Sequence, residues 1–232
     1  MKRAVISDIH ANLEALLAVL DDIEMHGVTE VICLGDIIGY GPHPAECLDT
    51  VMKRCGTIIL GNHDLLEMSD NLSAGTIYFI ESALQQLEDC EHDDEVKRHR
   101  TFLNNLPRLH TEGDYLFVHG SPREPTYEYV YPEDVADQRK IDALFQHVTK
   151  YCFQGHTHIP GVFTPQYEFV TPAQCDHQFS LAGQKLMVNV GSVGQSRDDD
   201  QRACYVLLDE GTIVFRRVPY QVEEMPRKLS RP

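Results

Sequence analysis

Aspartate, asparagine and histidine side chains follow five separate apolar runs of this chain. The five segments are Asp8-Ile9-His10, Gly35-Asp36, Gly61-Asn62-His63-Asp64, His119-Gly120 and Gly155-His156-Thr157-His158. Residues two apart on an extended chain point to the same side, so Asp8 and His10 can face one ion, as can His156 and His158. Carboxylate, amide and imidazole ligands without thiolate suit Mn²⁺, Fe²⁺, Ni²⁺ or Zn²⁺. The segments therefore indicate a metal site.

Each segment taken alone has an ordinary structural explanation. Asp-x-His is a common tripeptide, Gly-Asp after a strand is often a turn, and Asn-His-Asp can start a helix. His119 alone could be a hydrogen-bonded histidine of the core. The placement of the whole set favours the metal site, because ligands of open α/β sheets bind beyond the carboxyl ends of the strands.

The elements that must position these residues begin with strands alternating with helices. Apolar runs at 4–7, 31–34 and 57–60 predict buried strands. Leucines spaced three and four apart predict a helix from about Leu13 that stops before Gly27, and Pro44 can open a second helix that runs to about Arg54. This alternation over the first 60 residues predicts a parallel sheet with helical crossovers.

The later part of the chain has two further patterns, first helical and then rich in strands. Residues 65–106 predict a helical insertion that is strongly acidic at 88–95, and we read it as a solvated insertion, with a lid or dimer contact as the alternatives. The pattern then predicts a strand at 115–120, a helix over 132–150 and a strand from Tyr151. Strands dominate from Gly161 onward, with a hairpin turn at 209–211. We therefore expect one domain over 1–232: an α/β fold of two packed sheets flanked by helices, a four-layer α/β/β/α sandwich.

Composition limits the class of partner. The formal net charge is −16, from 36 acidic and 20 basic residues, and such a surface repels nucleic-acid phosphates and anionic lipid. Bound cations would still allow a small phosphate substrate. The seven cysteines include no Cys-x-x-Cys, and Cys33 and Cys152 lie in apolar runs, so we expect buried thiols. With no signal peptide or membrane-spanning run, we expect a reduced, cytoplasmic protein.

The ordered set of motifs resembles the calcineurin-like metallophosphoesterase superfamily. Its signature of D-x-H, G-D-x-x, G-N-H-[DE], H-G and G-H-x-H is matched here by Asp8-Ile9-His10, "GDIIG" (35–39), "GNHD" (61–64), "VHG" (118–120) and "GHTH" (155–158). The match covers residues 8–158 in order, and the β-rich end of the chain agrees with the second sheet of that family.

The resemblance implies two ion sites that share one carboxylate, that of Asp36. The ligands of the first ion would be Asp8, His10, Asp36 and His158. The ligands of the second ion would be Asp36, Asn62, His119 and His156. We expect two divalent ions, Mn²⁺ first, with Fe²⁺, Ni²⁺ or Zn²⁺ as alternatives. Two such ions can clamp the attacking and leaving oxygens of an in-line displacement, and a water or hydroxide that they share would be the nucleophile.

The resemblance also gives His63 a role at the substrate rather than at a metal. It would act as general acid for the leaving oxygen or stabilise the charge of the transition state, and its unperturbed pKa near neutral suits proton donation. Asp64 would orient the His63 ring or cap a helix, and both alternatives stay open. Further candidates for the substrate are Asn12, which could instead cap the first helix, and Tyr40, which could instead pack.

The arginines are less well defined by the sequence. Arg123, close after His119, is the best candidate for an arginine on the substrate, although a surface loop charge is an equal alternative. For Arg197 and Arg202, which bracket "DDDQ", we favour a self-paired solvated loop. The glycine-punctuated stretch 189–195 could form a wall of the site.

The function implied is that of the small bacterial and archaeal phosphodiesterases of the superfamily. Residues 39–44, "GYGPHP", stand where the protein phosphatases carry Asp-Arg-Gly, which counts against a phosphoprotein phosphatase and against the related symmetric dinucleoside-tetraphosphate hydrolase. We expect a metal-dependent phosphodiesterase acting on a small phosphate ester, such as a nucleotide. Alternatives are a phosphomonoesterase, a dinucleoside-polyphosphate hydrolase, or a non-catalytic scaffold, which the complete ligand set disfavours. A homodimer contact would be sought on the insertion.

Overall fold

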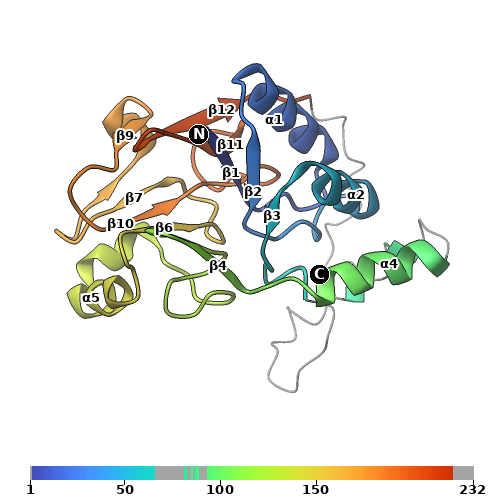
Figure 1. Cartoon of the computed structure of the whole chain (residues 1–232), viewed down its shortest axis with the longest axis horizontal. Helices are drawn as coiled ribbons and strands as arrows, with labels where there is room; N and C mark the ends of the chain where they lie inside the picture. Colours follow the sequence, from blue (N-terminus) through green and yellow to red (C-terminus); the bar gives the residue numbers. More distant parts are fainter. Residues whose placement is uncertain (1, 66–80, 83–84, 86, 89–92, 222–232) are drawn as a thin grey trace.

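Two six-stranded β-sheets form the centre of the protein (Figure 1). The structure is a computed structural model, and it describes residues 2–65, 81–82, 85, 87–88 and 93–221. We call the sheet that contains the first strand the first sheet, and the other the second sheet. Within the first sheet the strand order is β3 (Thr57–Ile58), β2 (Glu30–Cys33), β1 (Arg3–Ile6), β11 (Ala203–Asp209), β12 (Thr212–Val218) and β9 (Gln178–Ser180).

The second sheet collects strands from the middle of the chain. Its order is β4 (Leu109–Glu112), β5 (Tyr115–Val118), β6 (Tyr151–Gln154), β10 (Leu186–Asn189), β7 (Gly161–Phe163) and β8 (Phe169–Val170). Strands β1, β2 and β3 run parallel to one another, and so do β5, β6 and β10. Each parallel group therefore sends the carboxyl ends of its strands to one edge of its sheet.

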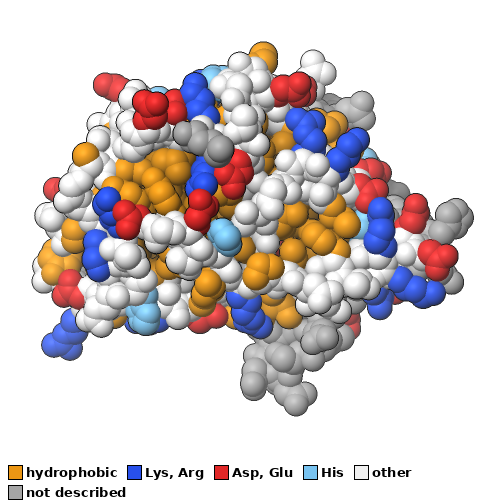
Figure 2. All heavy atoms as spheres, viewed as in Figure 1, with side chains coloured by type: hydrophobic (Ala, Val, Ile, Leu, Met, Phe, Trp, Pro, Cys, Tyr) orange, Lys and Arg blue, Asp and Glu red, His pale blue; other side chains and the backbone are white. Residues whose placement is uncertain are grey.

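Charged side chains of both signs are scattered over the face of the molecule shown in Figure 2. Lysine and arginine side chains lie among aspartates and glutamates there, and they border two broad hydrophobic areas. A polynucleotide binds along a continuous basic strip. The described surface of this face does not present one, which agrees with the acidic composition.

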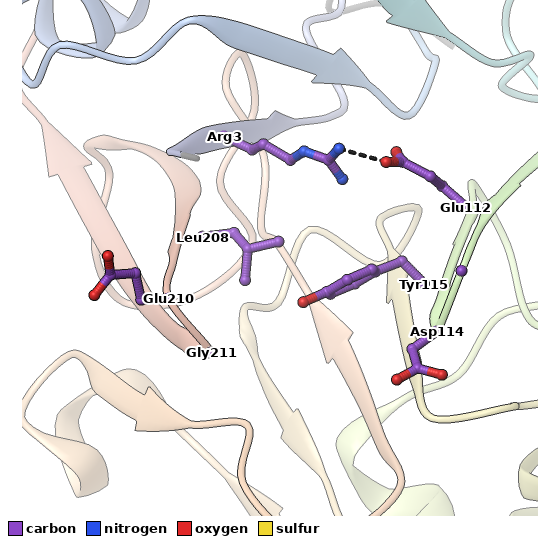
Figure 3. Close-up of a pocket in the computed structure, with 8 residues that line it drawn as sticks. Arg3, Glu112, Asp114, Tyr115, Leu208, Glu210 and Gly211 are labelled. Atoms are coloured by element: carbon purple, nitrogen blue, oxygen red, sulfur yellow. Dashed lines mark hydrogen bonds and ion pairs between the residues drawn. The ribbon is translucent and has the colours of Figure 1, made fainter.

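A groove of about 610 Å³ lies at the amino-terminal end of β1. Figure 3 shows Arg3 paired with Glu112 at 2.6 Å across it, with Tyr115 and Leu208 below. The residues selected above for metal chemistry follow the carboxyl ends of β1 and β5. The groove therefore lies at the end of the strands opposite to the candidate metal ligands. The charge of Arg3, which lines the groove, is neutralised by Glu112.

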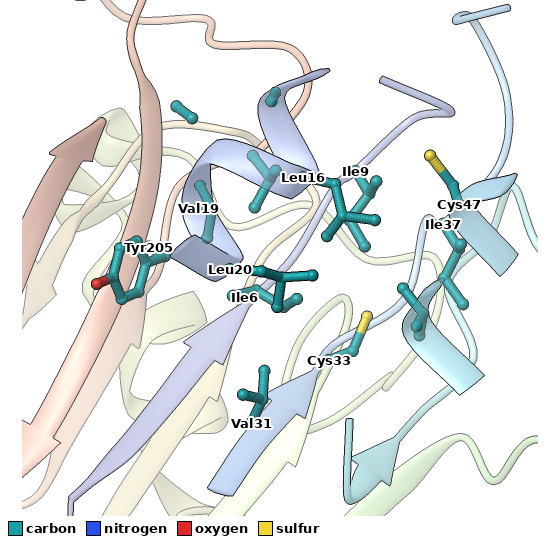
Figure 4. Close-up of a cluster of buried hydrophobic side chains, with 14 of the residues drawn as sticks. Ile6, Ile9, Leu16, Val19, Leu20, Val31, Cys33, Ile37, Cys47 and Tyr205 are labelled. Carbon is teal, nitrogen blue, oxygen red and sulfur yellow. The ribbon is translucent and has the colours of Figure 1, made fainter. Parts of the chain in front are cut away.

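Helices cover the outer face of each sheet. Helices α1 (Leu13–Met25) and α2 (Pro44–Arg54) bury their apolar sides on the first sheet, and Figure 4 shows Leu16, Val19 and Leu20 of α1 against Ile6 and Tyr205. Helix α5 (Gln138–Gln146) buries Ile141 and Leu144 on the second sheet. Residues of both sheets share one further cluster between them, including Val5, Ile32, Phe117 and Phe153. The layers are thus helix, sheet, sheet and helix.

This architecture confirms the predicted fold class, with differences in detail. The β11–β12 hairpin turns through Glu210 and Gly211, both with positive φ, as a two-residue turn requires. The helix expected over 132–150 is split, because the 3-10 helix Pro132–Ala136 ends at Asp137 and α5 starts after it. Strands β4, β8 and β9 and the 3-10 helix Pro172–Cys175 were not predicted.

The predicted helical insertion is described only in part. Its helix α4 (Asp93–Asn104) is connected to α2 through Asp49, which accepts a hydrogen bond from His99 at 2.8 Å and pairs with Arg98. Leu87 and Leu103 are buried in the same cluster as α1 and α2. Most of the segment 66–92, including much of the acidic stretch, lies outside the described residues.

Two remaining predictions concern cysteines and membranes. Cys33 and Cys152 are both buried, as predicted, and burial raises the pKa of each thiol. None of the helices in the described residues is long and apolar enough to cross a lipid bilayer.

A partly buried ion pair attaches α1 to the first sheet. Asp22 accepts a hydrogen bond from the Tyr205 hydroxyl at 2.7 Å and two from the Arg216 guanidinium, at 2.9 and 3.1 Å. Burial alone would raise the pKa of Asp22, but the hydrogen bonds from Arg216 and Tyr205 outweigh it and hold the pKa below its ordinary value of 3.8. The ionised carboxylate is therefore the form that stabilises the fold.

Replacing Asp22 by alanine should lower the free energy of unfolding by about 3 kcal/mol, because Arg216 and Tyr205 lose a partly buried partner. Urea denaturation at neutral pH measures this loss, with the exposed neighbour Asp21→Ala as the control. The stabilisation is present above the ordinary pKa of an aspartate and is lost as pH falls through the lower folded value. The difference between wild type and Asp22→Ala should therefore shrink in acid, and a difference that grows in acid would contradict this account.

Candidate metal centre

Seven side chains expected as metal ligands meet where five strands end. They follow β1, β2 and β3 of the first sheet and β5 and β6 of the second. Two groups of three have ligand atoms within 4.8 Å of one another, and all six members are buried. The first group is Asp8, His10 and His158, and the second is Asp36, His119 and His156.

Asp36 lies between the two groups. Its Oδ2 is 3.3 Å from Nε2 of His119 in the second group and 3.7 Å from Nε2 of His10 in the first. Asn62 extends the second group, since its Oδ1 is 3.0 Å from Nε2 of His119. The structure thus brings together all seven predicted ligands, in the two sets that the motifs implied.

Backbone carbonyls fix the orientation of the four histidine rings. Three of the rings donate a hydrogen bond from Nδ1: His10 to the carbonyl of Ile38, His119 to that of Leu34 and His158 to that of Gln195. The fourth, His156, donates from Nε2 to the carbonyl of Tyr127. A hydrogen bond of this kind fixes the tautomer and directs the lone pair of the other nitrogen inward.

The inward nitrogens face one another at contact distance. Nε2 of His10 is 3.1 Å from Nε2 of His158, and Nε2 of His119 is 3.1 Å from Nδ1 of His156. Each pair of nitrogens is close enough to share one cation, either a proton or a metal ion. Each pair is joined by an aspartate oxygen, so each offers the mixed nitrogen and oxygen donors that divalent ions such as Mn²⁺ or Zn²⁺ accept. The donor set fits two such ions.

Electrostatics also favour positive charge at this point. Burial would lower the pKa of His119, but the Asp36 carboxylate outweighs it and raises that pKa to about 9. Burial lowers the pKa of His10 to about 3, and burial together with His119 lowers that of His156 to about 3. The pKa of Asp36 lies well below its ordinary value despite burial, because of His119 and His63. The carboxylate is therefore charged and the other two rings are neutral, as metal ligands must be.

The backbone of the ligands is strained. Asp8, His10, Asp36, His156 and His158 all have φ between 52° and 68°. This left-handed region costs most residues roughly 1–2 kcal/mol. Backbone hydrogen bonds between neighbouring loops hold the strained residues, as in His10 N to Asp36 O at 2.9 Å. Strain of this kind clusters at functional sites.

Two glycines allow the loops to approach one another. A Cβ on Gly61 would lie 2.1 Å from the Asp36 backbone nitrogen and 2.2 Å from its Oδ1. Gly39, at φ 90°, leaves room for the His63 ring, whose Nδ1 would be 2.9 Å from a Cβ there. Any side chain at either position would displace the Asp36 carboxylate or the His63 ring.

His63 lies beside the ligands without being placed among them. Its ring packs edge-on against His10 at 5.1 Å and against Tyr40 at 4.9 Å, while its backbone nitrogen donates to Asp36 Oδ1 at 2.8 Å. Burial holds the pKa of His63 below its ordinary value. Tyr40 also packs against His10 at 4.8 Å, so it lines the same wall.

Asp64 has contacts that neither alternative suggested by the sequence included. Its carboxyl is fully buried and accepts four backbone N–H groups, from Asp36, Ile37, Ile38 and Gly61, at 2.7–3.2 Å. These bonds fasten the loop after β2 to the loop after β3. Burial and the nearby Asp36 raise the pKa of Asp64 to about 7. Asp64 is thus a positioning residue of the Asp36 and His63 loops.

Two predicted substrate-binding residues are occupied elsewhere. The Asn12 Oδ1 accepts from Ala15 N at 3.1 Å and its amide donates to Gly194 O at 2.9 Å, so it caps α1, as the alternative prediction stated. Arg123 pairs through two nitrogens with the Glu128 carboxylate, so its charge is neutralised within its own loop. Both residues thus have partners within the protein, and a contact of either with the substrate stays a prediction.

Arg197 is a cation at the site that the sequence interpretation missed. Its side chain donates to Gln195 Oε1 at 3.2 Å, and its charge opposes the effect of burial, which raises the pKa of Tyr40 and of Tyr129. In the part of the chain that the structure describes, no carboxylate forms an ion pair with Arg197, whereas Arg202 pairs with Asp200. The sequence signal that could have drawn attention to Arg197 is the adjacent stretch 189–195. That stretch was expected to form a wall of the site, and the carbonyl of its Gln195 accepts a hydrogen bond from His158.

Comparisons with known proteins agree with this geometry. Residues 1–212 match the sequence model of the calcineurin-like phosphoesterase superfamily domain. An uncharacterized protein of Methanocaldococcus jannaschii is 32% identical and covers 97% of this chain and 90% of its own.

Two solved structures share the fold. A metallophosphoesterase from Sphaerobacter thermophilus superposes with a TM-score of 0.76 at 32% identity, covering 95% of this chain and 90% of its own. A hypothetical protein from Pyrococcus horikoshii gives 0.64 at 21% identity, covering 95% and 88%. With the ordered motifs and the two groups of ligands in place, the chain belongs to the calcineurin-like phosphoesterase superfamily.

Proposed function

We propose that this protein is a two-metal phosphoesterase that hydrolyses phosphate diesters. The observation that carries the proposal is Asp36, whose carboxylate lies between two buried groups of nitrogen and oxygen ligands while its Oδ1 holds the backbone of His63. Two divalent ions held there would supply Lewis-acid activation of the phosphoryl group and of water. We propose Mn²⁺ first, with Fe²⁺, Ni²⁺ and Zn²⁺ as alternatives.

The chain's own residues then have separate roles. His63 donates an N–H to an ester oxygen of the substrate, either as general acid or as stabiliser of developing charge. Asp64 keeps the His63 loop and the Asp36 loop in register through four backbone amides. Tyr40 and Arg197 border the phosphate position, and the guanidinium can donate to a non-bridging oxygen.

The charge of the site supports a diester as the substrate. A phosphodiester carries one negative charge and a monoester dianion carries two, which calls for more cationic groups. Arg123 is paired with Glu128, and Arg197 is the arginine that the described structure leaves at the site. The second ester group would lie next to the exposed rings of Tyr129 and Tyr131, which continue outward from His156.

Hydrolysis of bis-p-nitrophenyl phosphate tests the proposal directly. Protein reconstituted with each of the four metals should release nitrophenol from the diester at a kcat/KM at least about tenfold higher than from p-nitrophenyl phosphate. A preference for the monoester would replace the diester assignment with that of a phosphomonoesterase. Protein that binds none of the metals would contradict the whole proposal.

Replacing Arg197 by alanine should lower kcat/KM for the diester about 10- to 100-fold, because a charge-assisted hydrogen bond to phosphate contributes roughly 1.5–3 kcal/mol. Steady-state kinetics measures the loss. Arg202→Ala is the matched control, since Arg202 lies in the same loop and pairs with Asp200. If Arg123→Ala lowers kcat/KM more than Arg197→Ala, the assignment of the phosphate to Arg197 is wrong.

The partner proposed is a small phosphate ester rather than a polymer or a membrane. The net charge of −16 repels polyphosphate chains and anionic lipid at long range. The two ions would reverse this field locally, at a buried point that a small molecule can reach. A homodimer contact through α4 and the rest of the insertion stays a prediction, which sedimentation analysis can test.

A further inference from the structure

Three tyrosines alternate along the loop that leads away from His119. Tyr127, Tyr129 and Tyr131 are 37%, 37% and 40% exposed, which is unusual for side chains of this size and places them in contact with solvent beside the ligands. Neither the metal ligands nor His63 requires three exposed aromatic rings nearby. Their arrangement therefore needs an explanation of its own.

Two of the rings continue from a metal ligand to the surface. The Tyr129 ring stacks on His156 with centroids 3.6 Å apart and planes 21° apart. The Tyr131 ring stacks on Tyr129 at 5.4 Å and 5°. We call the rings of Tyr129 and Tyr131 the aromatic platform. It begins one ring away from the candidate metal centre and remains open to solvent.

Hydrogen bonds hold the loop that carries the platform. The Tyr129 carbonyl accepts from Lys140 Nζ at 3.0 Å, and the Tyr131 backbone nitrogen donates to Asp134 Oδ2 at 2.7 Å. Arg123 and Ser121 both bind the Glu128 carboxylate from the start of the loop. The rings are thus ordered before any ligand arrives, which reduces the entropy lost on binding.

We propose that the aromatic platform binds a nucleobase, so that the substrate is a nucleoside phosphodiester whose base is carried by the ester group that remains on the phosphate. Aromatic side chains accept bases by stacking or edge-on contact, and every base offers a planar face. This inference rests on the proposed diesterase function and specifies its substrate class.

The position of His63 decides which ester group meets the platform. His63 packs against His10, in the first group of ligands, whereas Tyr129 packs against His156, in the second. A leaving group that takes a proton from His63 therefore departs on the side of His10. The retained group lies on the side of His156, next to Tyr129, whose ring is stacked directly on that of His156.

Two esters with one leaving group test the proposal. The p-nitrophenyl ester of thymidine 5′-phosphate carries a base on the retained group, and methyl p-nitrophenyl phosphate carries none. With the metal-loaded protein, kcat/KM should be about 5- to 150-fold higher for the thymidine ester, the range expected for one stacked base. Isothermal titration should likewise show thymidine 5′-phosphate binding more tightly than ribose 5-phosphate by a similar factor.

Variants of Tyr131 separate stacking from support of the metal ligand, because Tyr131 does not touch His156. Tyr131→Leu should abolish the preference in both measurements and leave turnover of the methyl ester unchanged, while Tyr131→Phe should keep the preference. Tyr167→Leu is the control, since Tyr167 lies on the β7–β8 turn at the far end of the second sheet and bonds Asp142.

The outcomes distinguish this inference from the function on which it rests. Turnover of both esters at equal kcat/KM, or a preference that survives Tyr131→Leu, would contradict base binding by the aromatic platform. Either result would leave the proposed diesterase function unaffected. Hydrolysis of neither ester would contradict the diesterase, and the titration would still decide the platform. Equal affinity for thymidine 5′-phosphate and ribose 5-phosphate would reject it.

Discussion

Replacing Asp36 by alanine should remove both divalent ions and lower kcat/KM for bis-p-nitrophenyl phosphate about 10⁴-fold or more, the scale of losing metal activation of water and phosphate. The reason is geometric, since Asp36 Oδ2 reaches His119 at 3.3 Å and His10 at 3.7 Å, one in each group. Elemental analysis of the purified variant, compared with wild type, measures the metal content.

Single histidine variants are the matched controls for Asp36. His158→Ala removes a ligand of the first group and His156→Ala one of the second, so each should lose metal mainly from its own site. Metal content should therefore fall from two ions to about one in each histidine variant and toward zero in Asp36→Ala. An Asp36 variant that keeps one ion in full would show that the carboxylate belongs to a single site.

Replacing His63 by alanine should lower kcat about 10²- to 10⁴-fold with both ions retained, the usual scale of general acid catalysis. His63 is distinguished from the other histidines of the site by its contacts, which are ring packing on His10 and Tyr40 rather than membership of a ligand group. Metal analysis and turnover measured on the same sample test both halves of the prediction. The exposed His147→Ala, on the far side of the second sheet, is the control.

The leaving group separates the two roles open to His63. A general acid matters most for a poor leaving group, so its loss should slow an alkyl phosphodiester far more than a nitrophenyl diester. A residue that only stabilises phosphoryl charge should affect both substrates by a similar factor. Loss of the ions together with activity would instead make His63 a ligand, contrary to the geometry described above.

The grouping of the candidate metal ligands could be predicted from the sequence because their signals are local. Asp8 and His10 are two residues apart after one strand, and His156 and His158 repeat the arrangement after another. A parallel sheet must bring such strand ends to one edge, so spacing and strand order together determine the site. The fold class followed from the same alternation of strands and helices.

The partners of Asp64, Arg123 and Arg197 could not be predicted from the sequence. Asp64 is beside His63 in the chain, yet its carboxyl bonds the backbone of residues 36–38, contributed by another strand. Arg123 follows a ligand closely, but Glu128 five residues later takes its charge. Arg197 influences the pKa of Tyr40, although the two residues are 157 positions apart in the chain. Closeness in the sequence does not predict which residue such a side chain will contact, because a side chain at the end of a strand can point toward any of the neighbouring loops.

The left-handed backbone of the ligands has a consequence for how this fold can change over evolutionary time. Aspartate and histidine at φ 52–68° carry a cost in backbone conformation, while their side chains make buried hydrogen bonds, such as that between Asp36 Oδ1 and His63 N. Glycine would relieve the strain at each position. A descendant that gave up catalysis would lose buried hydrogen bonds with each glycine acquired at positions 8, 10, 36, 156 or 158, so the strained backbone should outlast the activity.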